Sequence, residues 1–200
     1  MSESIFDMLQ GQLGGQALDM IGSQLGADRS TVERAVPAAL GSLMTGLARN
    51  AQSPDGASSL ASALSRDHDG SVLDNLSGVL SAPERTSGAG ILGHVFGARQ
   101  GAVESALGQS TGLDSAAIGK LLAMLAPLVM GALGKKQSQS GLRPSDLGSL
   151  LQREHQTARK QAPDLGMLGS LLDADGDGDI KDDVAKLGGS LLKNLLGGGR

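Results

Sequence analysis

The sequence predicts an all-α protein, and three observations carry that prediction. The 200 residues include no Cys, Trp or Tyr and only two Phe, so the apolar content is mainly Leu, Ala, Val, Ile and Met. Leu, Ala and Met favour helices, whereas strands favour β-branched and aromatic residues. Apolar residues of segments 28–47 and 114–133 recur with a helical period. Finally, segment 5–50 repeats as 91–136, at an offset of 86 residues. We therefore expect a multihelical protein of two tandem, related helical lobes.

The duplication sets the expected domain organisation. We expect a first lobe at residues 1–86 and a second at 87–200, because features present in both copies belong to the fold. The second copy is longer, and we expect an inserted helix or linker around 137–163. Its polar part, QREHQTARKQAPD, is typical of a linker. An Asp-rich loop and a helix close this lobe.

The first expected helix of each copy contains four glycines that would fall on one face of the helix. Because a Gly inside a helix costs about 1 kcal/mol relative to Ala, we expect a neighbouring helix to approach this face closely, within the chain or in a self-associated pair. The two last glycines of the sets have an alternative role as C-terminal caps. The glycines are Gly11, Gly15, Gly22 and Gly26, and again Gly97, Gly101, Gly108 and Gly112.

The second expected helix of each copy is the central, buried one. It begins in the first copy at 28–30, where Ser30 and Glu33 have capping-box spacing. Each central helix contains a proline, Pro37 or Pro127, which removes a backbone hydrogen bond and predicts a kink.

An aspartate-rich loop is the strongest polar pattern in the chain. Segment 172–183, LDADGDGDIKDD, resembles 64–75 and places oxygen ligands and a glycine with the spacing of the first half of a Ca²⁺-binding EF-hand loop. The end of the pattern departs from it, because Lys181 and Val184 stand where ligands belong. The candidate metal ligands are Asp173, Asp175, Asp177, Asp179, Asp182 and Asp183.

The same loops have a purely structural interpretation. Ser71 and Asp179 are good N-cap residues, and Asp74 and Asp182 follow three residues later, near the positive end of a helix. Capping and Ca²⁺ binding both remain open for the second loop.

Composition and motifs argue against three other classes of function. Segment Leu25–Val36 resembles a helix-turn-helix, yet residues 1–90 hold 5 basic and 10 acidic side chains, which opposes nucleic-acid binding. The histidines, His68, His94 and His155, lie far apart and no catalytic motif is present, so we expect no enzyme. The apolar run Leu121–Leu133 is shorter than the roughly 20 residues that a membrane span needs, and we expect a cytoplasmic protein without stable membrane insertion.

Three stretches of the chain resemble a known bacterial family. They are LGADRSTVERAVPAALGSLMTGLARNAQSP, STGLDSAAIGKLLAMLAPLVMGALGKK and LLDADGDGDIKDDVAKLGGSLLKNLLGGG. Together they are similar to the YidB-like family, domain of unknown function 937. The resemblance implies a multihelical, non-enzymatic bacterial protein, and it supplies no catalytic residues.

The functional expectation is association rather than chemistry. We expect the protein to bind itself or an unidentified protein. The alternative is a calcium-responsive form of that role, in which Ca²⁺ neutralises the six aspartates between 173 and 183 and orders the last helix. Membrane-surface association through the C-terminal tail is a lesser alternative.

Overall fold

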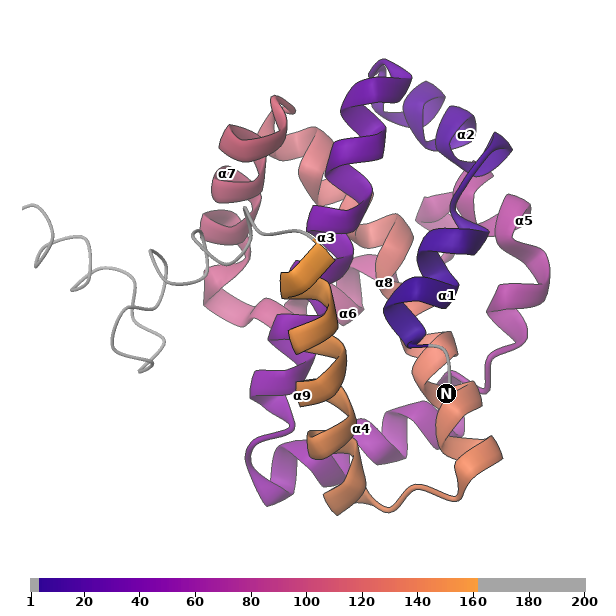
Figure 1. The fold of residues 1–200 in the computed structure, drawn as a ribbon, viewed down its shortest axis with the longest axis vertical. Helices are drawn as coiled ribbons and strands as arrows, with labels where there is room; N and C mark the ends of the chain where they lie inside the picture. The colour runs from indigo at the N-terminus through magenta and orange to yellow at the C-terminus, as the bar shows by residue number, and fades with distance from the viewer. Residues whose placement is uncertain (1–3, 162–200) are drawn as a thin grey trace, which may run out of the picture. The chain divides into compact units, whose positions relative to one another are not determined.

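The computed structural model describes residues 4–161, and its regular elements in that range are all helical (Figure 1). No strand occurs among these residues. The all-α prediction is confirmed for the described part of the chain.

The helices follow one another in two similar series. The first series and the short elements after it are α1 (Ile5–Gln12), α2 (Gln16–Leu25), α3 (Arg29–Asn50), α4 (Pro54–Asp67), η1 (Ser71–Asn75), α5 (Leu76–Ser81) and η2 (Pro83–Arg85). The second series is α6 (Gly88–Phe96), η3 (Gly97–Arg99), α7 (Gln100–Thr111), α8 (Ser115–Ser140) and α9 (Pro144–Gln161). Helices α1, α2 and α3 therefore correspond to α6, α7 and α8.

The two long helices begin in the same way. The Asp28 carboxylate accepts a hydrogen bond from the Thr31 N–H at 3.0 Å, and the Asp114 carboxylate accepts one from the Ala117 N–H at 2.7 Å. Each aspartate satisfies a backbone donor that the first turn leaves unpaired. The expected capping box is wrong, because Glu33 pairs with Arg29 instead of reaching back to the start of the helix.

Helices α3 and α8 form the centre of the fold. They pack against each other, and both continue across their prolines, Pro37 and Pro127. Most of α8 from Leu121 to Gly134 is buried. By length and composition α8 could cross a membrane, but 78% of its most apolar window is buried inside the protein. It is therefore placed as a core helix, which matches the expectation for this segment.

The glycine series does not form one packed helix face. Each expected helix is broken by a glycine with a positive φ, Gly15 at 57° and Gly97 at 54°. A Cβ added at Gly11, Gly15, Gly97 or Gly101 would meet no atom within 4 Å, so a close helix contact at these positions is wrong. Gly15 and Gly97 lie at exposed breaks between helices, where glycine supplies backbone freedom rather than a contact surface, and Gly11 and Gly101 lie on exposed faces of α1 and α7.

The other glycines of the series have local roles. Gly22 packs on the Ala27 carbonyl and Gly108 on the Leu113 carbonyl, where an added Cβ would lie 2.9 and 2.7 Å from the oxygen. Gly26 and Gly112 end α2 and α7 in the left-handed conformation, which confirms their alternative role as C-caps.

The described residues, 4–161, lie within a single compact unit. The two copies contact each other at many points, since α3 packs on α8 and α9 and α1 packs on α8. The duplication is therefore visible as matching helices, but the structure does not show two separate lobes. The boundary expected between residues 86 and 87 stays a prediction.

Candidate functional site

Helix α9 contains the polar segment that we expected to be a linker. Residues 152–161 continue the helix that begins at Pro144, so the linker prediction is wrong for them. The segment is helical because one face of α9 is buried, although most residues of the segment are polar. Its members are spaced by three, one, three and four residues, and they are Leu147, Leu150, Leu151, Glu154 and Ala158.

This face is covered by helices of the first series. Helix α9 packs most extensively on α3, next on α4, and also on α1 (Figure 1). We call the surface that these three helices offer to α9 the α9 groove. An amphipathic helix lying in a groove of other helices is a common form of protein recognition.

Glu154 is the polar residue of this buried face. It is 5% exposed, and its Oε2 accepts a hydrogen bond from the Phe6 N–H at 3.1 Å. Next to it, the Ser4 hydroxyl oxygen accepts a hydrogen bond from the Asp7 N–H at 3.0 Å. The first turn of α1 is therefore capped by one local side chain and by one carboxylate from the far end of the described chain. A negative charge at a helix N-terminus is favourable because the unpaired N–H groups carry positive partial charge.

Helix α4 of the first series has a leucine at the position where α9 of the second series has Glu154. At an offset of 90 residues, the buried residues Ala57, Leu60, Ala61 and Leu64 of α4 correspond to Leu147, Leu150, Leu151 and Glu154 of α9. Our sequence comparison matched the Asp-rich loops instead, at a different offset, and missed Glu154. The signal was present in the matching prolines, Pro54 and Pro144, that begin both helices.

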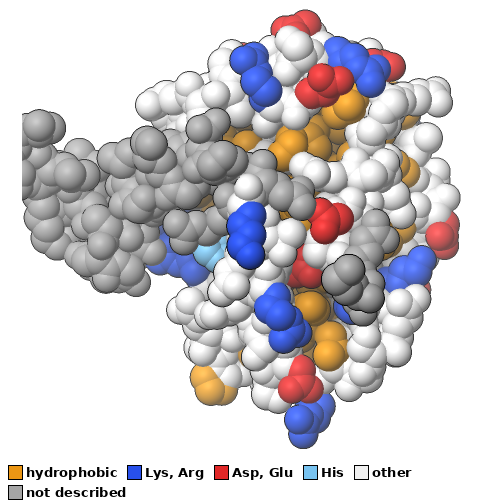
Figure 2. Space-filling model, in the orientation of Figure 1, with side chains coloured by type: hydrophobic (Ala, Val, Ile, Leu, Met, Phe, Trp, Pro, Cys, Tyr) orange, Lys and Arg blue, Asp and Glu red, His pale blue; other side chains and the backbone are white. Residues whose placement is uncertain are grey.

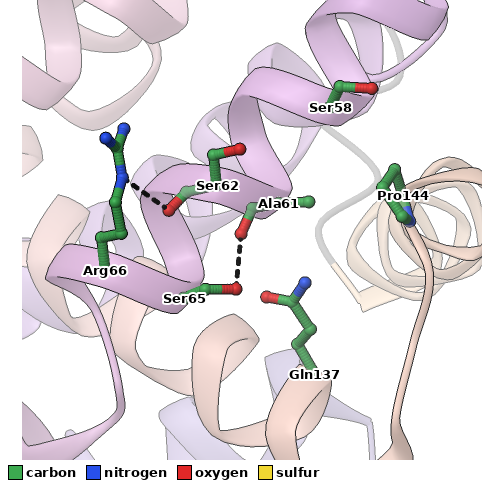
Figure 3. Close-up of a pocket in the computed structure, with 7 residues that line it drawn as sticks. All are labelled: Ser58, Ala61, Ser62, Ser65, Arg66, Gln137 and Pro144. Carbon is green, nitrogen blue, oxygen red and sulfur yellow. Dashed lines mark hydrogen bonds between the residues drawn. The ribbon is translucent and has the colours of Figure 1, made fainter.

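A hollow of about 560 Å³ lies beside the connection from α8 to α9. Figure 3 shows Gln137 of α8 and Pro144 of α9 across an open space from Ser58 and Ala61 of α4. Two of its polar side chains bond to their own helix: the Ser65 hydroxyl donates to the Ala61 carbonyl at 2.9 Å, and Arg66 Nε donates to the Ser62 carbonyl at 3.4 Å. The hollow thus separates the connection from α4.

The six candidate metal ligands, Asp173 to Asp183, lie outside the described residues. The corresponding first loop is described, and there the Asp69 carboxylate accepts a hydrogen bond from the Ser71 N–H at 2.9 Å. The side chain of Ser71, and after it this backbone N–H, hold the pKa of Asp69 below its ordinary value by hydrogen bonding. The N-cap of η1 is Gly70, so the expectation that Ser71 caps this helix is wrong. Within residues 4–161, no three His, Asp or Glu side chains are grouped to hold a metal ion.

The first Asp-rich loop instead packs against α8 through two glycines. A Cβ added at Gly134 would overlap the carbonyl of His68, and one added at Gly131 would overlap the side chain of Val72. The contact at Gly134 is a close helix-to-backbone contact of the kind that we expected from the other glycine series, and the contact at Gly131 is with a side chain. They occur on the long helix and join it to the loop.

The segment that resembles a helix-turn-helix, Leu25–Val36, forms the turn from α2 into α3. Its Arg29 pairs with Asp19 at 2.8 Å and with Glu33 at 2.9 Å, and both partners raise the pKa of Arg29. The cation beside the turn is therefore neutralised locally. Figure 2 shows Lys and Arg interspersed with Asp and Glu on this face, without a continuous basic surface. Hydrophobic side chains also show there, over α3 and α2.

The three histidines lie on different elements. His68 ends α4, His94 lies in α6 and His155 in α9. His68 is half-buried, and burial lowers its pKa. The backbone carbonyl of His94 accepts a hydrogen bond from the Asn50 amide at 2.9 Å.

One comparison with known proteins gives a match. The model of a family described as bacterial protein of unknown function (DUF937) matches residues 7–136, which is more than half of the chain. No curated protein and no solved structure matches. The matched region begins in α1 and ends within α8, so α9 lies beyond it.

Proposed function

Because the chain belongs to the DUF937 family of bacterial proteins of unknown function, and because its helices hold an amphipathic helix in a groove, we propose that it works by association with itself or with another protein. The observation that carries this proposal is the α9 groove. It is built from helices of the matched region and is filled by a helix from beyond that region.

The contacts of α9 support a recognition role for the groove. Three leucines, Leu147, Leu150 and Leu151, supply apolar contact along one face, and Glu154 adds a directional hydrogen bond. Buried apolar area gives such contacts their strength, and a buried polar pair penalises partners that lack the matching group. The groove is therefore suited to one particular kind of helix.

We propose a non-catalytic role for the polar groups of the described part. The carboxylates of Asp28, Asp114, Asp69 and Glu154 each accept a hydrogen bond from a backbone N–H near the start of a helix. Such groups stabilise helix ends. We also propose a cytoplasmic location and an architecture of two related lobes, 1–86 and 87–200, which the matching order of helices supports.

The test of association is the mass of the purified full chain in solution. Light scattering across a wide range of concentrations is expected to show species heavier than the 20.1 kDa monomer, or a stoichiometric partner that co-purifies. A 20.1 kDa species alone at every concentration, with no co-purifying protein, contradicts the proposal.

The second candidate is a calcium-responsive form of the same role. The spacing of Asp173, Asp175, Asp177 and Asp179 supports it, with Asp182 and Asp183 supplying the last ligand. Calorimetric titration of Ca²⁺ into the full chain is expected to release or absorb heat, and an Asp175→Ala, Asp177→Ala variant to abolish it. An identical trace for both proteins contradicts calcium binding.

DNA binding through the turn at Leu25–Val36 and association with a membrane surface are lesser candidates. An electrophoretic shift at low salt tests the first, because even non-specific binding is visible there. Co-sedimentation with anionic vesicles tests the second.

A further inference from the structure

We infer that a second copy of this chain binds through exchange of α9, so that the α9 of each protomer lies in the α9 groove of its partner. This inference rests on the proposed function, association, and names its partner and its binding element. Three observations support it: the helices on which α9 packs, the short connection from α8 to α9, and the contacts that would be lost if α9 left its groove.

Helix α9 packs away from the helix that precedes it. Its main contacts are with α3, α4 and α1, all in the first 67 residues, whereas α8, to which it is joined, is not among its main neighbours. A helix whose main contacts lie far back in the sequence can be donated to another molecule, because the helix that precedes it does not hold it.

The connection from α8 to α9 is short and exposed. Gly141 ends α8 with a φ of 59°, and only Leu142 and Arg143 separate it from α9. Gly141 and Arg143 are exposed, and a Cβ at Gly141 would meet no atom within 4 Å. A few such residues can absorb the change in φ and ψ that reorients a whole helix.

The hollow beside the connection gives it room to move. Gln137 and Pro144 line one side of this space of about 560 Å³, and α4 lines the other (Figure 3). The residues that flank the connecting segment, Gln137 and Pro144, therefore face open space on the side of α4. Leu142 of the segment is half-buried, and its N–H donates to the Gln137 carbonyl at 3.2 Å, so reorienting α9 breaks this bond.

Exchange preserves the contacts that hold α9. If α9 left its groove without replacement, Leu147, Leu150 and Leu151 would enter water, and the Phe6 N–H would lose the Glu154 carboxylate. The α9 of a second copy supplies the same three leucines and the same carboxylate in the same register. Only the connection differs between the closed monomer and the exchanged dimer, which makes the dimer accessible at low cost.

The first test changes the length of the connection in a matched pair of full-length variants. Deleting Leu142 and Arg143 shortens the reach of the chain and prevents α9 from folding back, so we expect light scattering to show mainly twice 20.1 kDa. Inserting a flexible Gly/Ser segment of about six residues after Leu142 is expected to shift the protein towards the monomer. Circular dichroism verifies that both variants keep their helices.

The second test identifies which chain supplies α9. The chain has no cysteine, and a Cβ at Gly148 of α9 would lie 3.1 Å from the Ala51 carbonyl oxygen at the end of α3. The neighbouring Gln52 and Ser149 are exposed and accept cysteines. The control is a Gln52→Cys, Ser149→Cys double variant treated with a short bismaleimide. The reagent is expected to link the two positions whether α9 lies in the groove of its own chain or in that of a partner.

The decisive sample mixes two single variants, Gln52→Cys and Ser149→Cys, refolded together at high concentration. We expect a covalent heterodimer whose linked peptides contain positions 52 and 149, and we expect the Gly/Ser insertion in both chains to reduce its yield several-fold. A dimer by light scattering that gives no such link leaves association in place and overturns the exchange of α9. A monomer at every concentration, in the wild type and in the shortened variant alike, overturns both.

Discussion

Helices α4 and α9 begin alike and bury the same positions, yet they differ at one of them. Leu64 of α4 is 1% exposed and apolar, whereas Glu154 of α9 is 5% exposed and bonds to the Phe6 N–H at 3.1 Å. A leucine accepts any apolar neighbour, while a buried carboxylate requires a donor at one place. Glu154 of α9 thus adds a hydrogen bond to a specific group on α1, whereas Leu64 supplies an apolar side chain at the matching position of α4.

The two long helices show a second difference between the copies. Position 134 of α8 is a glycine that lies against the carbonyl of His68, and the corresponding position of α3, at the offset of 86, is Ala48. The glycine of α8 therefore lets the backbone of a loop approach, and α3 carries a methyl group at the corresponding position. The two copies have the same helices but differ in what packs against these helices.

The largest effects are expected from exchanging the two buried residues, Leu64 and Glu154. Leu64→Glu places a carboxylate where the structure provides no donor equivalent to the Phe6 N–H, and we expect it to lower the free energy of unfolding by about 4 kcal/mol. Glu154→Leu leaves the Phe6 N–H unpaired and is expected to cost about 2 kcal/mol. Urea unfolding followed by circular dichroism measures both.

The control for this exchange is Glu154→Gln, whose side-chain oxygen still accepts a hydrogen bond. We expect it to cost about 1 kcal/mol, because only the charge is lost. Equal stability of the Glu154→Leu variant and the wild type would show that the bond to Phe6 does not hold α9.

The next largest effect concerns α8 and α3. Gly134→Ala forces the backbone at His68 away from α8, and we expect a loss of about 3 kcal/mol. The matched change on the other copy, Ala48→Gly, removes one methyl group and adds backbone freedom, and is expected to cost about 1 kcal/mol. Thermal unfolding of the two variants ranks them, and the reverse order would contradict the close contact at Gly134.

A smaller effect tests the break between the short helices. Gly15 and Gly97 have φ near 55° and strongly negative ψ, a conformation that L residues avoid, so Gly15→Ala and Gly97→Ala are each expected to cost about 1 to 2 kcal/mol. Gly93 lies within α6 with open space at its Cβ position, and Gly93→Ala is expected to stabilise by about 0.5 to 1 kcal/mol. The sign of the change in denaturation midpoint separates a turn glycine from a helical one.

The smallest effect is the pH dependence of the cap on α3. Hydrogen bonds from Ser30 and Thr31 hold the pKa of Asp28 well below its ordinary value of 3.8. Because the folded pKa is lowered, the stabilising contribution is present above pH 3.8 and is lost as the pH falls below it. Asp28→Asn is therefore expected to lose slightly less stability than the wild type in this acidic range, as measured by urea midpoints. Asp28 is exposed, so solvent screening keeps the difference small.

Part of this structure could be read from the pattern of residues. The helical period of the apolar residues predicted the buried central helices, and the cap role of Gly26 and Gly112 was one of two alternatives that the spacing left open. The break at Gly15 and Gly97 was missed, because a glycine that ends a helix and one that packs inside it follow the same spacing. The groove and Glu154 were missed because their partners lie far away in the chain.

Local patterns of residues predict the all-α class, the order of the elements and their repetition, because these depend on interactions within a few residues: periodic apolar faces, caps and prolines. The tertiary structure adds that the two copies pack against each other, that Gly134 of α8 lies against the backbone of a loop, and that a polar segment buries a glutamate. Phe6 and Glu154 lie at opposite ends of the described chain and are joined by burial and a hydrogen bond. A pattern of residues that are close in sequence therefore does not predict this contact.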